Sequence, residues 1–273
     1  MINALSIDLE YWWCNEFLTD YLPECREDLI IESLYPVLHL LDNHNVKATF
    51  FILGCVAEKY PRVIEELYQK GHEIASHAYS HQTLGKLGKE GFKKEIEMSL
   101  DLLGSYNPIG FRAPSFSANN TTLWYLDILE KHGFVYDSSI FPVNMILYGV
   151  PDAPLWKYKP SRGNIAMNDP DGPIIEFPLS VVKIGKNIPV AGGFYFRFFP
   201  EWFLLWSLTQ INKTRPAVIY LHPWETYPGI PRLKLPYHSR FEAYYGVNNS
   251  LKKFDNLLKR VKFQPIREFL HEI

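Results

Sequence analysis

The sequence predicts an α/β fold built on parallel strands. Short runs rich in β-branched and aromatic residues alternate with longer segments whose apolar residues recur three and four positions apart. Such alternation is typical of parallel strands joined by crossover helices. The chain has 273 residues, 47% of them hydrophobic and 21% charged, so it can bury a full core. One α/β barrel domain commonly reaches this length.

Strands and helices are expected to alternate through the first half of the chain. Gly71 and Gly133 follow two of the expected helices, where glycine commonly ends a helix. The expected strands cover residues 4–9, 47–54, 72–76, 109–113 and 134–136, and the expected helices cover 26–44, 56–70, 89–103 and 120–132.

The second half is less regular. Residues 142–172 are rich in proline and glycine, which predicts a loop insertion that lies over the site. No domain boundary is evident, so we expect one domain from residue 1 to residue 273. Beyond the insertion we expect strands at 174–182 and 185–191 that form a hairpin, and then a helix at 200–212. A buried strand is expected within 217–225 and an irregular stretch at 226–249. A helix at 250–263 and a last turn would end the chain.

Composition excludes several classes of protein. The net charge of −2 argues against a nucleic-acid partner. Three cysteines without a CxxC pair predict reduced thiols rather than a disulfide framework. The first residues lack the pattern of a signal peptide, and no run is long enough to span a membrane. We therefore expect a cytoplasmic location, or a peripheral one at the inner membrane face.

Residues 71–84 contain two histidines, His77 and His81, directly after an expected strand. Positions four apart share a face in a strand and in a helix, so both imidazoles can approach one point. Neutral imidazole is the commonest metal ligand among protein side chains. The pair therefore indicates a metal site that needs a third ligand from elsewhere, although surface or hydrogen-bonded core histidines would show the same spacing.

Other polar residues also follow expected strands. Asp8 and Glu10 lie two apart at the end of the first strand, so they point the same way. In parallel α/β folds, functional groups collect at the carboxyl ends of the strands. Arg112, Asp137 and His222 also follow expected strands. Simpler roles are open for each: Arg112 could form a structural ion pair, His222 could be a packed core histidine, and Asp137 could cap a turn or helix.

Five segments together resemble the polysaccharide deacetylases of carbohydrate esterase family 4, and they occur in that family's order. A bacterial branch associated with exopolysaccharide loci is similar in TFFILG, GHEIASH and GGFYFRFFP and carries an extra C-terminal segment, which here would be residues 226–273. The five segments are SIDLE at 6–10, SHAYSH at 76–81, FRAPSF at 111–116, YDSS at 136–139 and YLHPWE at 220–225.

The resemblance implies a distorted (β/α) barrel of seven or eight parallel strands with one divalent metal ion at its C-terminal mouth. Zinc is the expected metal, with cobalt, nickel and manganese as alternatives. The implied ligands are His77, His81 and one acid of the first segment. Many family members have two adjacent aspartates there, whereas this chain has Asp8, Leu9 and Glu10. Glu10 is the better candidate ligand and Asp8 the better candidate base, and the reverse assignment stays open.

The implied reaction is hydrolysis of an N-acetyl group on an amino-sugar glycan, with a metal that polarises the carbonyl and activates water. Asp8 would act as base and His222 as acid, Arg112 would orient Asp8, and a backbone N–H near RAPSF would help to bind the oxyanion. Asp137 would orient His222 or join the Arg112 network. Four aromatic residues near strand ends are candidates for stacking on sugar rings, with core packing as the alternative for each: Trp12, Phe116, Tyr195 and Trp224.

Other functions remain open at this stage. One is hydrolysis of a small cyclic amide or ureide, as in allantoinase-like enzymes, and another is non-catalytic sugar binding. A two-metal phosphoesterase would need more clustered ligands than the sequence offers. Glu176 and Glu225 are expected to be structural, and the histidines away from strand ends are expected to have no role in the site.

Overall fold

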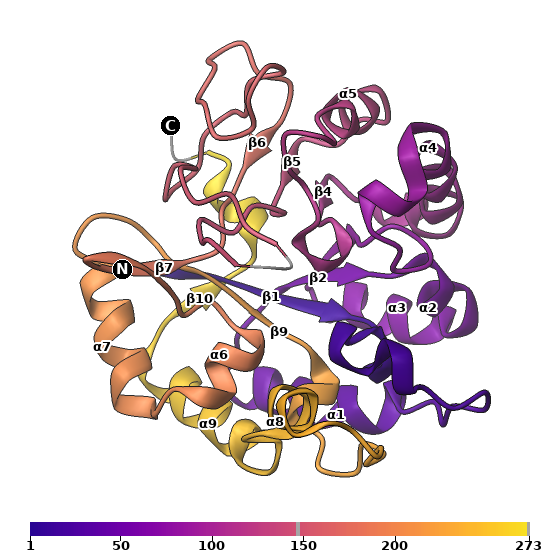
Figure 1. The fold of residues 1–273 in the computed structure, drawn as a ribbon, viewed down its shortest axis with the longest axis vertical. Coiled ribbons are helices and arrows are strands. Elements are labelled where there is room, and N and C mark those ends of the chain that lie inside the picture. Colours follow the sequence, from indigo (N-terminus) through magenta and orange to yellow (C-terminus); the bar gives the residue numbers. More distant parts are fainter. Residues whose placement is uncertain (146–147, 272–273) are drawn as a thin grey trace.

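The computed structural model describes residues 1–145 and 148–271 and is organised around one eight-stranded sheet (Figure 1). Every strand pairing within this sheet is parallel, which confirms the predicted α/β class. Helices form an outer layer around the sheet. The strands of the sheet are β1 (Asn3–Leu9), β2 (Thr49–Ile52), β3 (Glu73–Ser76), β4 (Gly110–Phe111), β5 (Tyr136–Asp137), β6 (Ile175–Glu176), β9 (Val218–Leu221) and β10 (Phe263–Gln264).

β1 is the centre of the sheet, and all seven of its residues are buried. It pairs with β2, β9 and β10. Leu5, Ile7 and Leu9 pack in the cluster shared with the outer helices, whereas Ala4 packs with residues of the barrel interior. Because side chains alternate along a strand, Asp8 is directed to the interior side as well.

The barrel is open between β6 and β9, because the described residues form no strand ladder there. Irregular hydrogen bonds connect the segment between these two strands to β9. Ser180 N–H donates to the carbonyl oxygen of Val218 at 3.2 Å, and Tyr220 N–H donates to that of Ala191 at 2.8 Å. At Gly192 the backbone lies so close to the Tyr220 carbonyl oxygen that a Cβ would overlap it.

The helices differ from expectation in two places. The single helix expected at 56–70 is two helices, because Tyr60 leaves helical geometry (φ −125°, ψ 51°) before Pro61. The stretch expected to be irregular at 226–249 contains α8. The α-helices are α1 (Ile30–Asn43), α2 (Gly54–Lys59), α3 (Pro61–Gln69), α4 (Leu84–Leu103), α5 (Trp124–Lys131), α6 (Gly193–Phe198), α7 (Glu201–Ile211), α8 (Tyr237–Tyr244) and α9 (Val247–Arg260).

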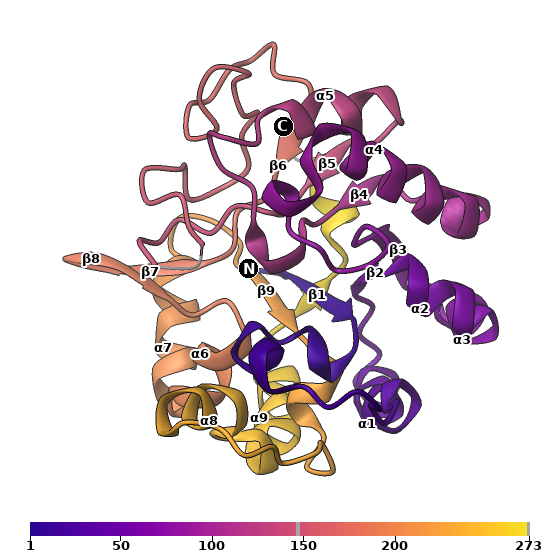
Figure 2. The same ribbon diagram turned by 45° about the vertical axis from the view of Figure 1, so that its right-hand side comes forward.

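Two further segments complete the description. The expected hairpin is present as β7 (Val181–Ile184) and β8 (Lys186–Pro189), and it projects from the body in the turned view (Figure 2). The described part of 142–172 is mostly irregular, with isolated bridges at Tyr158 and Pro160; residues 146–147 of this expected insertion lie outside the described residues.

The C-terminal residues belong to the same sheet as the first strand. β10 pairs with Asn3 and Ala4, and a 3-10 turn at Ile266–Phe269 follows where a last turn was expected. The expected tail ends at residues 272–273, which lie outside the described residues. Across the described residues, no helix is both long and apolar enough to cross a membrane.

Candidate metal centre and active site

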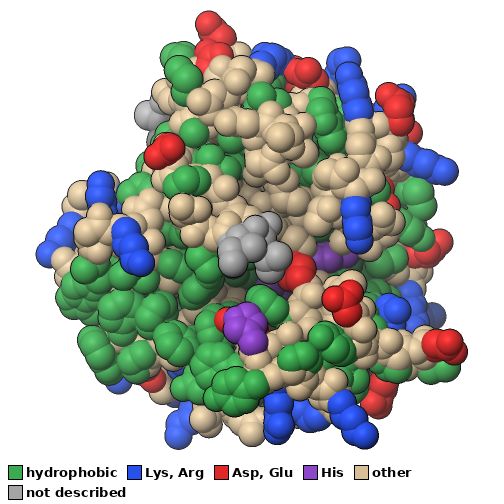
Figure 3. Space-filling model, in the orientation of Figure 1, with side chains coloured by type: hydrophobic (Ala, Val, Ile, Leu, Met, Phe, Trp, Pro, Cys, Tyr) green, Lys and Arg blue, Asp and Glu red, His purple; other side chains and the backbone are tan. Residues whose placement is uncertain are grey.

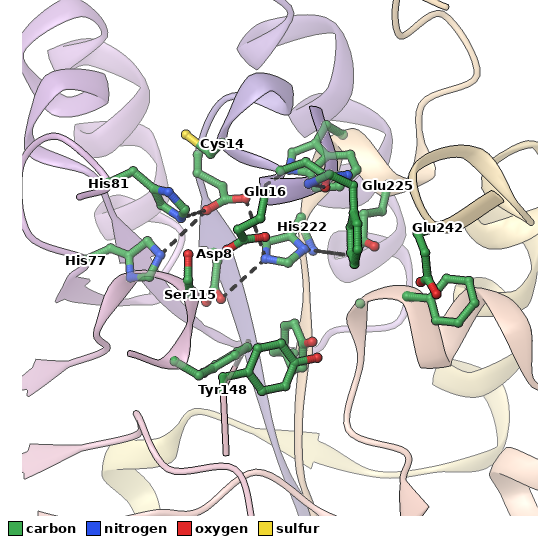
Figure 4. A pocket seen from close by; sticks show the side chains of 18 of the residues that line it. Asp8, Cys14, Glu16, His77, His81, Ser115, Tyr148, His222, Glu225 and Glu242 are labelled. Carbon is green, nitrogen blue, oxygen red and sulfur yellow. Dashed lines mark hydrogen bonds and ion pairs between the residues drawn. The ribbon is translucent and has the colours of Figure 1, made fainter. Parts of the chain in front are cut away.

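A small pocket opens at the carboxyl ends of β1, β3 and β9 (Figure 4). Its volume is about 90 Å³. Acidic and histidine side chains are visible in the hollow near the middle of the face drawn in Figure 3. Seven of the residues that were expected at the site line this pocket: Asp8, Glu10, His77, His81, Phe116, His222 and Trp224.

Glu10 faces both histidines of the pair. Its Oε2 atom lies 2.7 Å from Nε2 of His81 and 3.6 Å from Nε2 of His77. The other ring nitrogen of His77, Nδ1, lies 2.7 Å from the carbonyl oxygen of Arg112, to which it donates. That hydrogen bond leaves the lone pair of His77 Nε2 directed at Glu10, the arrangement that a metal-ligating histidine commonly has.

The Glu10 carboxylate is suited to a cation. Its Oε2 atom is buried and makes no hydrogen bond of good geometry among the described residues, although His81 Nε2 lies at ion-pair distance, 2.7 Å away. Burial opposes ionisation, but His81 and His222 outweigh it and hold the pKa of Glu10 well below its usual range. A buried, ionised carboxylate is costly unless positive charge compensates it, and a metal ion between Glu10 and the two imidazoles would supply that charge. Two imidazole nitrogens and one carboxylate oxygen are donors that suit zinc and similar divalent metals.

Cys14 is a further candidate ligand that the sequence reasoning missed. Donor atoms of Glu10, Cys14 and His81 lie within 4.8 Å of one another, and within residues 1–145 and 148–271 this is the one such group of three. His77 is not part of it. Burial raises the pKa of the Cys14 thiol. The four-residue spacing from Glu10 to Cys14 was a signal, although a weak one.

The loop after β3 has an unusual backbone that places His81. Ala78 and His81 have φ values of 61° and 62°, in the left-handed region that non-glycine residues rarely adopt. The Glu95 carboxylate accepts hydrogen bonds from the backbone N–H groups of Tyr79 and Ser80 and so holds the loop between them. Strained residues of this kind persist where the surrounding structure fixes them, and they often lie at functional sites.

Asp8 is held by Arg112, which is fully buried. Nη1 of Arg112 donates to Asp8 Oδ1 at 2.7 Å and to Ser6 Oγ at 2.8 Å. Its remaining donors reach Ser138, and the guanidinium carbon lies 4.1 Å from the ring centroid of Phe51. Asp8 Oδ2 lies 3.7 Å from His222 Nε2 on the pocket side. Arg112 therefore fixes one oxygen of Asp8 and leaves the other toward the pocket.

His222 is oriented by Glu225, which had been expected to be structural only. Nδ1 of His222 lies 2.8 Å from Glu225 Oε2, and Arg197 Nε donates to the other oxygen at 2.9 Å. The ring of Trp224 stacks on His222 with a centroid distance of 5.3 Å. The HPWE spacing, with the acid three residues after the histidine, was the sequence signal for this pair.

The charges around His222 keep it protonated. Burial would lower the pKa of His222, but the carboxylates of Glu10, Glu225 and Asp8 outweigh burial and raise it to about 9. Nε2 then carries a proton and faces the pocket, 3.6 Å from Glu10 Oε1.

Two roles were expected for Asp137, to orient His222 or to join the Arg112 network; among the described residues it has no contact with His222, and it lies beside the Arg112 network. It is fully buried and accepts hydrogen bonds from Tyr125 Oη at 2.7 Å and from the Ser138 N–H at 2.8 Å. Burial raises the pKa of Asp137 to about 6, and it is hydrogen-bonded to the Glu176 carboxyl. Its link to Arg112 runs only through Ser138, so it supports the site from outside the pocket.

The aromatic candidates divide into two groups. Phe116 and Trp224 line the pocket, although Trp224 is 4% exposed and its Nε1 donates to Glu10 Oε1 at 3.1 Å. Tyr195 is half-buried and lines a different hollow, beside β8. The prediction that Trp12 stacks on a sugar is wrong. Its side chain is 2% exposed, and its Nε1 donates to the Glu27 carbonyl oxygen. A ring buried in this way cannot stack on a sugar.

Other residues of the lining were not anticipated. They include acidic, aromatic and basic side chains, most of them from the second half of the chain: Glu16, Tyr148, Phe194, Arg197 and Glu242. Figure 4 labels three of them around the pocket, Glu16, Tyr148 and Glu242.

Comparison with known protein families gives two adjacent matches. Residues 28–136 match the polysaccharide deacetylase family, and residues 138–271 match a family described as a domain of unknown function (DUF3473). A peptidoglycan-N-acetylglucosamine deacetylase of Bacillus cereus is 41% identical over 87 residues, which is 31% of this chain and 32% of that protein. The chain spans less than half the length of this and other curated relatives that it matches.

Solved structures agree on the fold. The allantoinase Puue has a TM-score of 0.60 at 14% identity, covering 97% of this chain and 87% of that chain. A family 4 carbohydrate esterase pseudoenzyme of Bacillus anthracis has a TM-score of 0.52 at 16% identity, covering 99% of this chain and 66% of that one. At these identities the likeness concerns the fold alone.

Fold and site together define a deacetylase-like α/β barrel with a candidate metal centre at its mouth. Residues 28–136 carry a polysaccharide deacetylase domain, and residues 138–271 match the adjacent family DUF3473.

Proposed function

We propose that the protein is a metal-dependent hydrolase that removes N-acetyl groups from an amino-sugar-containing glycan. The main support is the buried Oε2 atom of Glu10, which lies 2.7 Å from Nε2 of His81 and 3.6 Å from Nε2 of His77. The match of residues 28–136 to the polysaccharide deacetylase family supports the same function. In this proposal Glu10, His77 and His81 hold one divalent ion, most simply zinc, and Cys14 lies beside them.

The bound ion would polarise the acetyl carbonyl and lower the pKa of water. The chain's own residues would handle the protons. Asp8 would accept the proton of the attacking water on Oδ2, the oxygen that Arg112 leaves toward the pocket. A C–O bond forms at the acetyl carbon as this proton moves.

His222 would supply the second proton. Its Nε2 faces the pocket, and the carboxylates of Glu225 and Asp8, which are not ligands in this proposal, favour the protonated ring. Transfer of that proton to the amide nitrogen lets the C–N bond break without an amide anion, so the products are acetate and a free amine. For the backbone donor to the oxyanion we propose the N–H of Ser115, which lines the pocket; the N–H groups of Ala113 and Phe116 already have partners.

Acetate release from N-acetylglucosamine oligomers tests this proposal. We expect release by the metal-loaded protein, loss after treatment with a chelator, and recovery when zinc or cobalt is added. Unchanged release after removal of the metal would contradict the proposal. Release of acetate from none of a series of N-acetylated glycans would point to non-catalytic sugar binding.

Hydrolysis of a small cyclic amide is the second candidate, because the fold is shared with an allantoinase. The pocket of about 90 Å³ is well below the ~300–1,000 Å³ of sites that enclose a drug-sized ligand. A pocket of this size suits an acetyl group, with the sugar that bears it lying outside the pocket. Turnover of allantoin without turnover of any N-acetylated glycan would favour this alternative.

A further inference from the structure

A second and much larger hollow lies beside α8. Its volume is about 970 Å³, and its walls are α8 and the segment that leads into it, Arg232–Tyr237. The family resemblance assigned no role to this region, and the sequence reasoning expected it to be irregular. In Figure 3 the lower part of the face, where α8 lies in Figure 1, carries Lys and Arg side chains beside hydrophobic ones.

The groove is positively charged. Three exposed cations line it, Arg232, Lys234 and Arg240, and none of its lining residues is acidic. Within the described part of the chain, no carboxylate lies within ion-pairing distance of these three side chains. The whole chain has a net charge of −2, so this local excess runs against the overall balance. A cluster of uncompensated cations attracts an anionic ligand.

The groove is also lined by aromatic rings. Tyr237, Phe241 and Tyr244 recur at helical spacing on one face of α8, and Tyr237 is 86% exposed. Tyr244 is held in place, since its hydroxyl accepts from the Leu233 N–H and donates to the Pro231 carbonyl oxygen. The Arg232 guanidinium also lies over the ring of Tyr244, 4.5 Å from the ring centroid. Phe241 and Tyr244 are half-buried, whereas Tyr237 and the neighbouring Tyr245 are exposed and offer flat apolar faces of the kind that sugars stack on.

α8 forms the wall between this groove and the catalytic pocket. Glu242, on a neighbouring face of the helix, lines the pocket (Figure 4). Phe194 of the pocket and Phe241 of the groove have ring centroids 5.7 Å apart. A helix with its side chains is ~10–12 Å across, so a ligand of a few linked units can reach from one opening to the other.

We propose that this groove binds the acidic sugars of a carboxylate-bearing glycan, next to the N-acetylated sugar presented to the catalytic pocket. The inference rests on the proposed function and deepens it. The catalytic pocket, at about 90 Å³, takes only the acyl group, so the remaining chain must lie on the surface around it. Cations pair with the carboxylates, and the rings of α8 stack on the sugars.

Binding of probes that the enzyme cannot turn over tests this proposal on the full metal-loaded protein. Hexagalacturonate carries carboxylates and sugar rings, cellohexaose carries rings only, and hexaglutamate carries carboxylates only. None has an acetamide, so a failure of the proposed deacetylation leaves the binding result intact. We expect calorimetry to show binding of hexagalacturonate that weakens with added salt, and at least about tenfold weaker binding of the other two.

Two groove variants and one control locate the binding. The triple variant Arg232→Gln, Lys234→Gln, Arg240→Gln is expected to bind hexagalacturonate about tenfold more weakly, and Tyr237→Ala is expected to weaken it as well. The matched control Lys89→Gln, Lys94→Gln, Lys131→Gln removes three exposed charges on the side of α4 and α5 and should leave affinity unchanged.

Two results would overturn the proposal. Equal affinity for hexagalacturonate and hexaglutamate would show a surface that binds any polyanion, a peptide or nucleic acid included. Equal losses in the groove variant and the control would place binding elsewhere. If acetate release from hyaluronan oligosaccharides is observed, the groove variant should raise KM with kcat unchanged, since it removes contacts remote from the reacting bond.

Discussion

Asp8 and Arg112 form the most enclosed ion pair of the pocket. Both side chains are almost completely buried, and Arg112 uses its donors on Asp8, Ser6 and Ser138. A buried guanidinium without its carboxylate is costly, so this pair must stay intact for the fold as well as for the site. Its value to the proposed reaction is orientation, because one oxygen of Asp8 is fixed while the other faces His222.

Replacement of Asp8 tests its role as base. Asp8→Asn keeps an oxygen for Arg112 but cannot accept a proton, so we expect kcat to fall about 10²–10⁴-fold while zinc content stays at that of the wild type. Acetate release and metal analysis measure the two effects. Asp20→Asn, at an exposed site, is the matched control. A fully active Asp8→Asn enzyme would show that another group is the base.

Glu225 tests the orientation and charge of His222. Its carboxylate is one of the groups that raise the pKa of His222 to about 9. A general acid must be protonated, so activity should fall as pH rises through that pKa. We expect Glu225→Gln to lower kcat and to move the alkaline limb of the kcat/KM profile to lower pH. Glu268→Gln, an exposed control, should move neither, and an unchanged limb in Glu225→Gln would contradict the assignment.

At the scale of elements, β9 ends directly before His222, and its position depends on a close backbone contact. Gly192 lies against the Tyr220 carbonyl oxygen, and a Cβ there would overlap it. We expect Gly192→Ala to push β9 aside, to lower the free energy of unfolding by about 1–3 kcal/mol, and to reduce activity. Gly85→Ala, where a Cβ meets nothing within 4 Å, is the control. Equal stability of both variants in urea unfolding would contradict this account of the β9 contact.

The ends of β5 and β6 hold a buried carboxyl pair, Asp137 and Glu176. Burial raises the pKa of both, that of Asp137 to about 6, and Asp137 further raises that of Glu176. Between pH ~4 and 6 the folded protein therefore holds protons that the unfolded chain has released. The contribution of this pair to the unfolding free energy therefore falls as pH rises through this window, because the state that binds more protons is favoured at low pH.

Glu176→Gln removes one of the two charges and keeps the oxygen that accepts the Ile140 N–H at 2.9 Å. We expect this variant to lose less unfolding free energy than the wild type between pH 4 and pH 7, measured by urea unfolding. Asp171→Asn, at an exposed site, should keep the wild-type slope. The same slope in all three proteins would mean that the pair does not share a proton.

For the whole molecule, the two family matches meet within a single sheet. The first strand pairs with β9 and β10, which lie in the second matched region, and α9 contributes Phe254 and Leu257 to the core cluster around β1. His222 reaches the pocket only because β9 lies beside β1. The C-terminal region is therefore part of the scaffold that assembles the candidate site.

The sequence predicted the strands that carry the pocket, because each is a short apolar run that ends in a polar residue. It also predicted that Asp8, Glu10, His77, His81, Arg112, Asp137 and His222 come together, since parallel strands share one carboxyl edge, although Asp137 lies outside the pocket. Besides Cys14 and the role of Glu225, two elements were not predicted. α8 has a weak apolar pattern after Pro236, and β10 is only two residues long. Whether Trp12 faced the core or the pocket depended on contacts with distant segments, which local patterns do not contain.

The central claim is that Glu10, His77 and His81 hold one divalent ion. Anomalous X-ray scattering at the zinc edge, from crystals of the zinc-loaded protein, tests it most directly. We predict one strong peak within coordination distance of Glu10 and of Nε2 of both histidines, and its absence in His81→Ala. A zinc peak elsewhere, or no peak at this mouth of the barrel, would contradict the account.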